Sequence, residues 1–327
     1  MAKAQRKYWL GFDLGGTKML AVVYDKAFEP VGSQRRRTKA QLGAEAGVER
    51  ILNTIDDALA NAGISAGQLA GIGIGCPGPV NPETGVSFAL SNLGWESIAL
   101  AAVLEKRFDC PAVLANDVDM GTFGEFQFGA GKGGTSVLGV FPGTGIGAGC
   151  VQRGQILSGK GISCLELGHI CVQPDGPLCG CGRRGCLETF ASRLAISSAC
   201  AVAAYRGEAP YLLKHAGMDL SNIRSGALAA SVAAGDIAVA QIIEHAAEWL
   251  GVGIATAVNL LAPDVVVLGG GLVEAMPKRI LKAATRSAAS HVMPVYEDRF
   301  KIVVAELGDD ATTKGAAAWA HHVISGK

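Results

Sequence analysis

The chain of 327 residues lacks net charge and has few charged residues for its length. Lysine plus arginine and aspartate plus glutamate number 29 each, and charged residues make up 18% of the chain. A balanced chain gives no global electrostatic reason to coat nucleic acid or an anionic membrane. Hydrophobic residues reach 49%, which excludes a disordered protein and predicts a sizeable core. We therefore expect a globular protein of about two domains, with neither nucleic acid nor a membrane as a partner.

The sequence also lacks a secretory signal and a long uncharged hydrophobic run. Asp13 interrupts the N-terminal apolar stretch early. Of the longest uncharged runs, residues 133–152 contain Pro142 and seven glycines. Residues 249–263 form another such run, which is shorter than the roughly 20 residues that a bilayer requires. These absences predict a cytoplasmic protein.

Glycine is the residue in excess. The 45 glycines are about twice the usual share, and they cluster between apolar runs without a collagen period, as in backbone-lined ligand loops. The nine cysteines are an odd number in a large chain without a signal. Such cysteines favour free thiols or a metal site over a disulfide framework.

The apolar patterns predict a coarse internal duplication, in which two α/β halves each open with a glycine-turned hairpin. Alternating helices and strands favour parallel or mixed sheets covered by helices, and no Ser/Pro-rich linker separates the halves. Three successive arginines at 35–37 read as a solvated sheet edge. In the first half we expect strands over residues 8–13, 19–24, 31–38, 71–75 and 112–115, with helices around 48–59 and 98–108. In the second half we expect strands over 136–141, 146–151, 264–268 and 300–305, with helices over 236–261, 276–290 and 310–324, the first capped by Asp236.

Two glycine-rich turns have the properties needed to hold phosphate. The motif DLGGTK, residues 13–18, offers backbone N–H groups, a hydroxyl and a lysine, and Asp13 could hold magnesium through water. The motif GTGIGAG, residues 143–149, places Thr144 where the first motif has Thr17. Either motif alone could be an ordinary hairpin turn, and neither has the spacing of a Walker loop or a dinucleotide fingerprint. Two related turns, one in each half, indicate a bound nucleotide.

One histidine and three cysteines indicate a zinc site. One imidazole and three thiolates match a closed tetrahedral zinc centre, and the intervening glycines leave the backbone free to fold around one ion. With four protein ligands there is no open coordination position, so we expect the zinc to be structural. Cys164 and Cys171 are near enough in sequence to substitute as ligands, and unrelated reduced cysteines are the alternative. The four expected ligands are His169, Cys179, Cys181 and Cys186.

Three carboxylates are candidates for catalysis or for binding a polyhydroxylated ligand. Asn116-Asp117 ends a predicted strand, where catalytic groups of α/β sheets tend to lie. Glu166 and Glu188 bracket the predicted zinc loop, so folding of that loop would bring them together. In isolation each is most simply a surface acid. Carboxylates that converge with an amide and an imidazole fit a sugar.

Six motifs in order along the chain resemble the ROK family of bacterial sugar kinases and sugar-responsive repressors. They are DLGGTK, Asn116-Asp117 followed by Gly124-Glu125, GTGIGAG, ELGHI at 166–170, CGCGRRGCLE at 179–188 and VVLGGG at 266–271. The resemblance implies an α/β, actin/hexokinase-like (ribonuclease H-like) duplicated two-lobe ATPase fold with a cleft between the lobes. We expect a small N-terminal lobe over 1–117 with a helix at 308–327 packed against it, and a larger lobe over 118–307 that carries the zinc loop.

The resemblance also assigns roles residue by residue. It implies Asp117 as the catalytic base and His169 as both a zinc ligand and a sugar contact. The implied sugar contacts are Asn116, Glu166, His169 and Glu188, with Gly78 and Asn92 as further positions on the sugar side. The implied phosphate-binding residues are Asp13, Gly15, Gly16, Thr17, Lys18, Gly143, Thr144, Gly145 and Gly147, and Gly270 and Gly271 would lie near the adenosine.

Among the family's enzymes the sequence is most similar to ATP-dependent glucokinases. That similarity implies transfer of a phosphoryl group from Mg-ATP to a primary hydroxyl of glucose, with ATP, Mg²⁺ and structural Zn²⁺ as cofactors and a homodimer as the expected assembly. Two alternatives remain open: a kinase for another hexose (N-acetylglucosamine, mannose or fructose), and a non-catalytic sugar sensor. Because the first phosphate motif begins at Asp13, we expect no helix-turn-helix domain before it, which favours a kinase.

Overall fold

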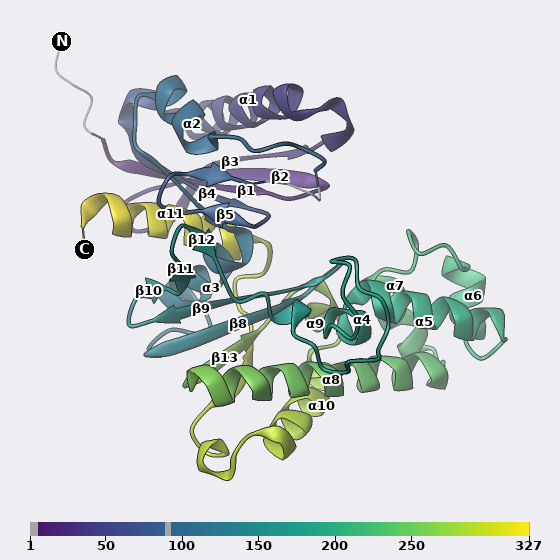
Figure 1. The fold of residues 1–327 in the computed structure, drawn as a ribbon. Coiled ribbons are helices and arrows are strands. Elements are labelled where there is room, and N and C mark those ends of the chain that lie inside the picture. The colour runs from purple at the N-terminus through teal and green to yellow at the C-terminus, as the bar shows by residue number, and fades with distance from the viewer. Residues whose placement is uncertain (1–5, 89–92, 327) are drawn as a thin grey trace. The chain divides into compact units, whose positions relative to one another are not determined.

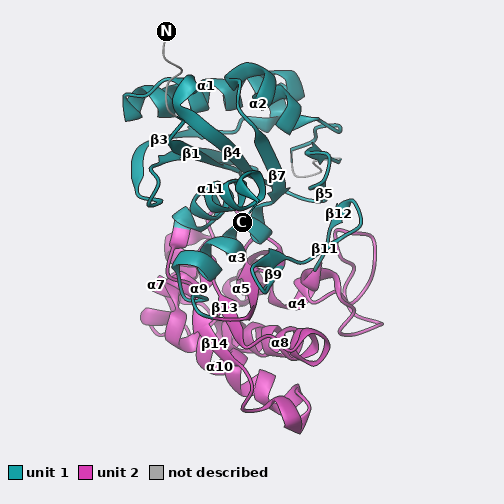
Figure 2. Ribbon diagram, turned by 90° about the vertical axis from the view of Figure 1, so that its left-hand side faces the viewer, with its two compact units in different colours: residues 1–133, 149–165, 309–327 teal, residues 134–148, 166–308 magenta. Residues whose placement is uncertain are grey.

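The computed structural model of the chain describes residues 6–88 and 93–326 (Figure 1). These residues form two compact units, coloured separately in Figure 2. The first unit contains residues 1–133, 149–165 and 309–327, and the second contains 134–148 and 166–308. This division differs from the expected boundary after residue 117, because the helix that begins there and the segment 149–165 belong to the first unit.

The first sheet has five strands in the order β3-β2-β1-β4-β7. Strands β1, β2 and β3 pair antiparallel, whereas β4 pairs parallel with both β1 and β7. The parallel pairing places the carboxyl ends of β1, β4 and β7 at one edge. The elements of this unit are β1 Tyr8–Leu14, β2 Lys18–Tyr24, β3 Pro30–Arg37, α1 Ala44–Ala62, β4 Leu69–Cys76, β5 Val80–Asn81, β6 Val86–Ser87, α2 Leu100–Phe108, β7 Ala112–Asn116, α3 Asp117–Phe128, β10 Gln155–Ile156, β11 Ser158–Gly159, β12 Ile162–Ser163 and α11 Ala311–Ser325, with 3₁₀ turns at Ala40–Leu42, Ala66–Gln68 and Gly308–Asp310.

Both faces of this sheet are buried, so its central strands are apolar almost throughout rather than alternating. Leu10, Phe12 and Leu14 pack with residues of α1 and α2 in one core cluster, and Trp9 packs with residues of α11 in another. Burial of apolar side chains on this scale is the main favourable term in folding. The predicted strands and amphipathic helices of the first half are confirmed to within a few residues.

Helix α11 approaches the first sheet unusually closely. A Cβ atom on Gly11 of β1 would lie 1.8 Å from the carbonyl oxygen of Thr313, and one on Gly73 of β4 would lie 1.8 Å from that of Ala316. Only glycine permits this approach of backbone to backbone. The hydroxyls of Tyr24 and Thr313 share a hydrogen bond of 2.9 Å inside the contact. The C-terminal helix therefore completes the unit that begins with β1.

The second sheet repeats this arrangement in the order β10-β9-β8-β13-β14. Its strands β8, β13 and β14 are parallel neighbours, so the duplication predicted from the sequence extends to strand order. The remaining elements are β8 Ser136–Pro142, β9 Ile146–Gln152, α4 Glu188–Ala191, α5 Arg193–Tyr205, α6 Pro210–Ala216, α7 Ser225–Ala233, α8 Ile237–Leu261, β13 Val265–Leu268, α9 Gly271–Ala275, α10 Pro277–His291 and β14 Lys301–Val304, with 3₁₀ turns at Leu167–His169 and Pro294–Tyr296.

Asp236 precedes α8, as expected, but its side chain caps a different helix. Its carboxylate accepts hydrogen bonds from the backbone N–H groups of Tyr211 and Leu212 in the first turn of α6, at 3.2 and 2.9 Å, and from the hydroxyl of Ser231. Burial alone would raise the pKa of Asp236, but these hydrogen bonds outweigh it and hold the pKa below its usual value. The predicted cap is therefore wrong in its target, since α6 lies closer to the carboxylate than the sequence suggested.

Helix α8 is the only helix among the described residues that is long and apolar enough to cross a membrane, and 44% of its most apolar window is buried. Its buried residues include Ile243, Leu250 and Ile254, and it packs against α10 and α5. Its full apolar length is not evident from uncharged runs of sequence, because Glu248 interrupts them. A core helix of a folded unit passes the same length test.

Candidate functional site

The first glycine turn joins β1 to β2 and is held mainly by backbone hydrogen bonds. The N–H of Gly15 donates to the carbonyl of Lys18 at 3.0 Å, and the hydroxyl of Thr38 donates to the carbonyl of Gly15 at 2.6 Å. Gly16, Thr17 and Lys18 are exposed. The turn therefore presents backbone and side-chain donors to solvent, as a phosphate site requires.

Asp13 and Asp117 lie at the same edge of the first sheet. Asp13 is in register with Gly75 of β4, which is in register with Ala115 of β7, two residues before Asp117. Burial, and then the negative charge of Asp117, raise the pKa of Asp13 to about 7. A cation beside these two carboxylates would relieve both the desolvation and the repulsion. The donor set therefore fits a hard divalent cation such as Mg²⁺, with Asp13 as the residue to hold it.

A third carboxylate, Asp309, joins this group and was missed in the sequence. Its Oδ2 atom accepts from Lys18 Nζ at 2.9 Å and from Arg35 Nη1 at 3.0 Å, and the hydrogen bond from Lys18 keeps the pKa of Asp309 below its usual value. The expected solvated edge at residues 35–37 is confirmed, because β3 is an edge strand and Arg35 and Arg37 are exposed. The structure adds that Arg35 pairs with Asp309 and Arg36 with Asp57. No sequence signal links residues 18 and 309, which meet only through α11.

Asn116 has a structural role beside its proposed contact with sugar. Its side-chain oxygen accepts from the N–H groups of Val118 and Asp119 at 2.8 and 3.3 Å and so caps α3. Its Nδ2 atom faces Gly78, where a Cβ would lie 2.7 Å away. Gly78 thus leaves room for the amide. Asn92, the other expected position on the sugar side, lies outside the described residues.

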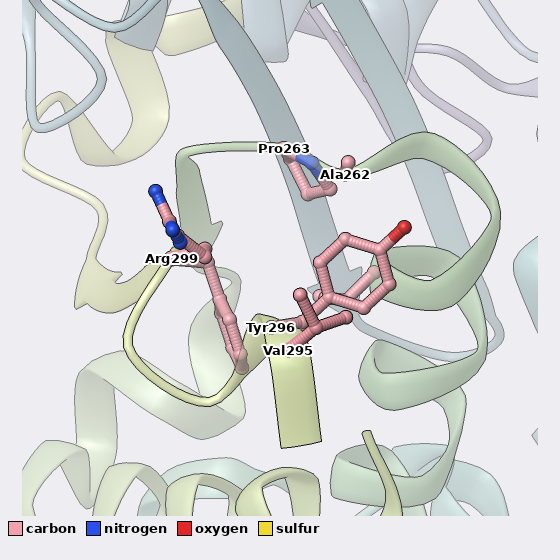
Figure 3. A pocket seen from close by; sticks show the side chains of 7 residues that line it. Ala262, Pro263, Val295, Tyr296 and Arg299 are labelled. Carbon is pink, nitrogen blue, oxygen red and sulfur yellow. The ribbon is translucent and has the colours of Figure 1, made fainter. Parts of the chain in front are cut away.

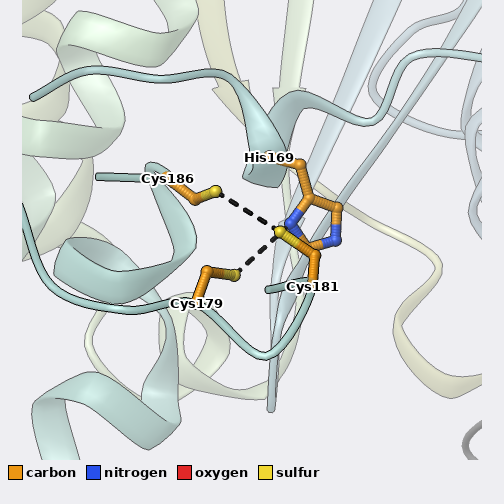
Figure 4. Close-up of side chains that lie close together, drawn as sticks. All are labelled: His169, Cys179, Cys181 and Cys186. Atoms are coloured by element: carbon orange, nitrogen blue, oxygen red, sulfur yellow. Dashed lines mark hydrogen bonds between the residues drawn. The ribbon is translucent and has the colours of Figure 1, made fainter. Parts of the chain in front are cut away.

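The four predicted zinc ligands lie together in the second unit (Figure 4). Their ligand atoms all lie within 4.8 Å of one another. Cys181 Sγ is 3.7 Å from Cys186 Sγ, and Cys179 Sγ is 3.6 Å from His169 Nδ1. Ligands about 2.3 Å from a tetrahedral zinc would be roughly 3.8 Å apart, so the set fits the metal. Cys164 and Cys171 lie outside this group, where their thiols donate to the carbonyls of Leu157 and Arg184.

The three thiols differ in how easily they lose a proton. Burial raises the pKa of Cys186 to about 12 and also raises the pKa of Cys179. A hydrogen bond from the backbone of Arg183 lowers the pKa of the exposed Cys181. A divalent cation would have to displace the protons of the two buried thiols, so metal affinity would fall at low pH.

Glu188 connects the cysteine cluster to the second glycine turn. Its Oε2 atom accepts from the N–H of Ile146 at 3.0 Å, and Cys179 Sγ donates to its Oε1 atom at 3.7 Å. A Cβ on Gly145 would lie 2.2 Å from Oε2, so this carboxylate lies directly against the turn. Glu166 is exposed, and its carbonyl accepts from the N–H of His169 at 2.9 Å, which closes the short turn that carries both residues.

The second glycine turn joins β8 to β9 and is also held by α5. The N–H of Gly143 donates to the carbonyl of Gly145 at 2.8 Å, and the N–H of Arg193 donates to the carbonyl of Gly143 at 2.9 Å. The Arg193 guanidinium donates to Thr144 Oγ1 at 2.8 Å. Arg193 was missed because nothing in the sequence relates it to the turn.

The glycines after β13 lie near this turn, as a nucleotide site requires. A Cβ on Gly270 would lie 2.9 Å from the carbonyl oxygen of Pro142. Gly270 precedes α9 and Gly271 begins it, while Gly147 lies within β9. The structure thus brings the predicted residues together in two sets, one in each unit.

Two cavities formed by described residues contain none of these predicted side chains. A cavity of about 290 Å³, shown in Figure 3, is lined mostly by apolar residues between the end of α8 and the start of β14, including Ala262, Tyr296 and Arg299. Another of about 640 Å³ lies between α8 and α10 and includes Trp249 and Arg286. Arg286 pairs there with Glu248. Both cavities lie in the second unit.

Comparison with known proteins shows similarity over almost the whole chain. The ROK family model matches residues 9–323. A glucokinase from Halalkalibacterium halodurans is 32% identical over 94% of this chain and 93% of its own length. A putative xylose repressor from Caldicellulosiruptor sp. is 30% identical over 94% of this chain and 77% of its own length.

The fold is also that of a solved relative. The crystal structure of a ROK family glucokinase from Streptomyces griseus in complex with glucose and AMPPNP matches with a TM-score of 0.84 and 28% identity, covering 96% of this chain and 99% of that one. The family match and the structural match agree with the motifs and the strand order. The chain therefore belongs to the ROK family and has an actin/hexokinase-like α/β fold.

Proposed function

We propose that the chain is an ATP-dependent sugar kinase and that glucose is its acceptor. The relatives named glucokinases support this assignment, as does the structural relative that binds glucose and AMPPNP. Phosphoryl transfer needs a base or positioning carboxylate, a divalent cation and donors for the phosphates. The two sets of residues described above offer each of these.

The first unit supplies the chemistry. Asp117 accepts the proton of the attacking hydroxyl as general base. Asp13 would hold Mg²⁺ through water, while the first turn and Lys18 bind phosphate oxygens. The cation would neutralise charge on the phosphate chain from which one phosphoryl group is transferred. The capped start of α3 fixes the backbone of Asp117, because Asn116 satisfies the N–H groups that follow it.

The second unit supplies most of the sugar contacts. Glu188, Glu166 and His169 bind sugar hydroxyls, and zinc holds the loop that carries them. When His169 binds zinc through Nδ1, the atom that faces Cys179, its Nε2 atom is left to donate to the sugar. Zinc has no open position in this ligand set, so it supplies structure and takes no part in the phosphoryl transfer.

The observation that carries the proposal is the pairing of Asp13 and Asp117 at one sheet edge. Two carboxylates close enough for one to raise the pKa of the other are costly to a fold. A sheet edge with a purely structural role would not require these two carboxylates. A cation-dependent reaction at this edge gives both of them a role.

An ATP-coupled assay across a panel of sugars tests the proposal. We expect Mg-dependent ADP release with glucose to exceed that with N-acetylglucosamine, mannose, fructose and xylose in kcat/KM. Saturating glucose should also stabilise the fold, by about 2.7 kcal/mol at 100 times its dissociation constant. If another sugar gives the higher kcat/KM and the larger thermal shift, the glucose assignment is replaced by that sugar.

A sugar-responsive regulator is the second candidate. The relatives named xylose repressors or putative xylose repressors favour it, since four of them match 76% or more of this chain. A regulator would bind its sugar without turnover. Sugar binding by calorimetry together with no ADP release in the presence of Mg-ATP would establish this alternative and reject the kinase.

A further inference from the structure

Arg193 is placed at the second glycine turn by two contacts. It is the first residue of α5, and its N–H donates to the carbonyl of Gly143 at 2.9 Å. Its guanidinium donates to Thr144 Oγ1 at 2.8 Å. Backbone and side chain therefore both contact the turn. The planar head lies beside Thr144, which is itself exposed.

This position is electrostatically unfavourable for a cation in the absence of an anion. The N-terminus of a helix carries a partial positive charge, which favours acidic residues and disfavours arginine. Helix α5 has no acidic residue in its first turn to compensate. The N-terminal end of the helix and the guanidinium thus add their positive charges at one point. A bound anion would relieve this repulsion.

Among the described residues, no carboxylate forms an ion pair with Arg193. The first turn differs in this respect, since its Lys18 pairs with Asp309 at 2.9 Å. A guanidinium has five N–H donors, and Thr144 occupies one of them. The remaining donors suit the bidentate recognition of phosphate oxygens.

We propose that Arg193 binds the phosphate chain of the nucleotide at the second glycine turn. The inference rests on the proposed kinase function and deepens it, because it adds a donor-side residue to that site. A triphosphate has the charge and the several oxygens that match a guanidinium beside the hydroxyl of the exposed Thr144. Arg193 then has two partners: the hydroxyl of Thr144, which orients it, and the phosphate oxygens, which it neutralises.

The alternative is that Arg193 only fixes the turn. The carbonyl of Gly143 is bound by the backbone of Arg193, so that contact survives any substitution of the side chain. A purely structural side chain would act only through its hydrogen bond to Thr144, which a neutral donor such as the amide of glutamine could replace. Direct binding of phosphate instead needs positive charge. The two roles therefore separate by charge, and full recovery of AMPPNP affinity in Arg193→Gln would show a purely structural role.

Calorimetric titration of the full chain with Mg-AMPPNP, Mg-ADP and adenosine tests the proposal. We expect Arg193→Ala to weaken AMPPNP binding by at least about tenfold, as expected for loss of a hydrogen bond to a charged group. ADP should weaken less and adenosine should be unchanged. Arg193→Lys should restore part of the AMPPNP affinity, because it keeps the charge, and Arg193→Gln should not. Arg206→Ala, at the exposed other end of α5, is the matched control and should bind all three ligands as the wild type does.

Equal affinity of wild type and Arg193→Ala for AMPPNP would overturn the inference, as would an equal loss for AMPPNP and adenosine. In either case, sugar phosphorylation by the wild type would leave the proposed function standing. If instead the wild type bound neither AMPPNP nor ADP, the kinase proposal would be rejected, and this inference, which depends on it, would be rejected as well. A melting curve for each variant confirms that the titrated protein is folded.

Discussion

The two glycine turns occupy equivalent places in their sheets but are held in different ways. The first is closed by its own backbone and by Thr38, and its lysine pairs with Asp309. The second also has a backbone hydrogen bond of its own, between Gly143 and Gly145, but it is held in addition by the side chains of Glu188 and Arg193. A repeated hairpin thus sets the backbone of a turn, and the elements that follow give each turn its own side chains. This difference explains why carboxylates gather beside the first turn and the cysteine cluster connects to the second.

The largest expected effect is on turnover, and it comes from Asp117, at the same sheet edge as the first turn. Asp117→Asn removes the proposed base but keeps an oxygen that can accept the N–H of Val118, which Asp117 binds at 2.9 Å. Turnover should fall by about 10²–10⁴-fold, with zinc content and melting temperature retained. Steady-state kinetics and a melting curve on one preparation check this. A folded variant with more than about a tenth of wild-type turnover would remove Asp117 from the catalytic role.

The second expected effect is a change of folding stability with pH, caused by Asp13 beside the first turn. The pKa of Asp13 is raised from 3.8 to about 7 in the folded chain. Below pH 3.8 the carboxyl is protonated in both the folded and the unfolded chain. As the pH rises towards 7, the carboxyl loses its proton in the unfolded chain but keeps it in the folded chain. Asp13 therefore lowers the stability of the fold progressively over this pH range. Asp13→Asn should therefore be more stable than the wild type at pH 8 without Mg²⁺, by roughly 4 kcal/mol at most. At low pH the two proteins should be alike.

Urea unfolding in EDTA at about pH 3 and about pH 8 measures this difference. Added Mg²⁺ at pH 8 should stabilise the wild type and leave Asp13→Asn unchanged. Asp298→Asn is the control, since Asp298 is exposed and should not respond to Mg²⁺. Equal stability of wild type and Asp13→Asn at pH 8 would show that the carboxylate carries no such penalty.

Breaking the cysteine cluster should affect the second region alone. Cys181→Ser should lose the bound zinc and weaken sugar affinity by about 10–100-fold, because the metal orders the loop that carries Glu166 and Glu188. Elemental analysis and sugar titration measure the two effects. Cys171→Ser is the matched control, because Cys171 is exposed and outside the cluster. Active wild-type protein that contains no zinc would disprove the metal assignment.

The smallest expected effect concerns the second turn itself. A Cβ on Gly145 would meet Glu188 Oε2 at 2.2 Å, whereas a Cβ on Gly143 would meet nothing within 4 Å. Gly145→Ala should therefore displace Glu188 from Ile146 and lower stability by about 1–3 kcal/mol, and Gly143→Ala should change it by less than about 0.5 kcal/mol. Denaturant unfolding of both variants tests the difference. Similar losses in the two would mean that Glu188 does not hold the turn.

Much of this fold was predictable because its signals are local. Strand β1 and the turn at Gly15-Gly16 follow from a short apolar run that ends in glycines, and the cysteine cluster follows from four residues within 18 positions of sequence, 169 to 186. Helix α3 was not predicted. It is buried from Asp119 to Glu125 without interruption, so it has no apolar stripe of the kind that a period of 3.6 residues detects.

The missed site residues depend on long-range contacts. Asp309 reaches Lys18 only because α11 packs on β1, and Arg193 reaches Thr144 only because α5 begins beside the second turn. Asp236 shows the same limit, since it binds α6 across a separation of 24 residues. Local pattern predicted which residues carry charge, and tertiary packing decided which partner each one meets.

The close packing of α11 also has a consequence for how the protein folds during its synthesis on the ribosome. Strands β1 and β4 bring Gly11 and Gly73 against carbonyls of a helix that is translated long after them. Until α11 emerges, the face of the sheet that carries Trp9 and Val22 has no cover, and a nascent sheet with an open apolar face is prone to aggregation. The second unit, residues 134–148 and 166–308, is synthesised in full within this interval. All residues of the second unit are therefore translated before the first unit is complete, because the first unit still lacks α11.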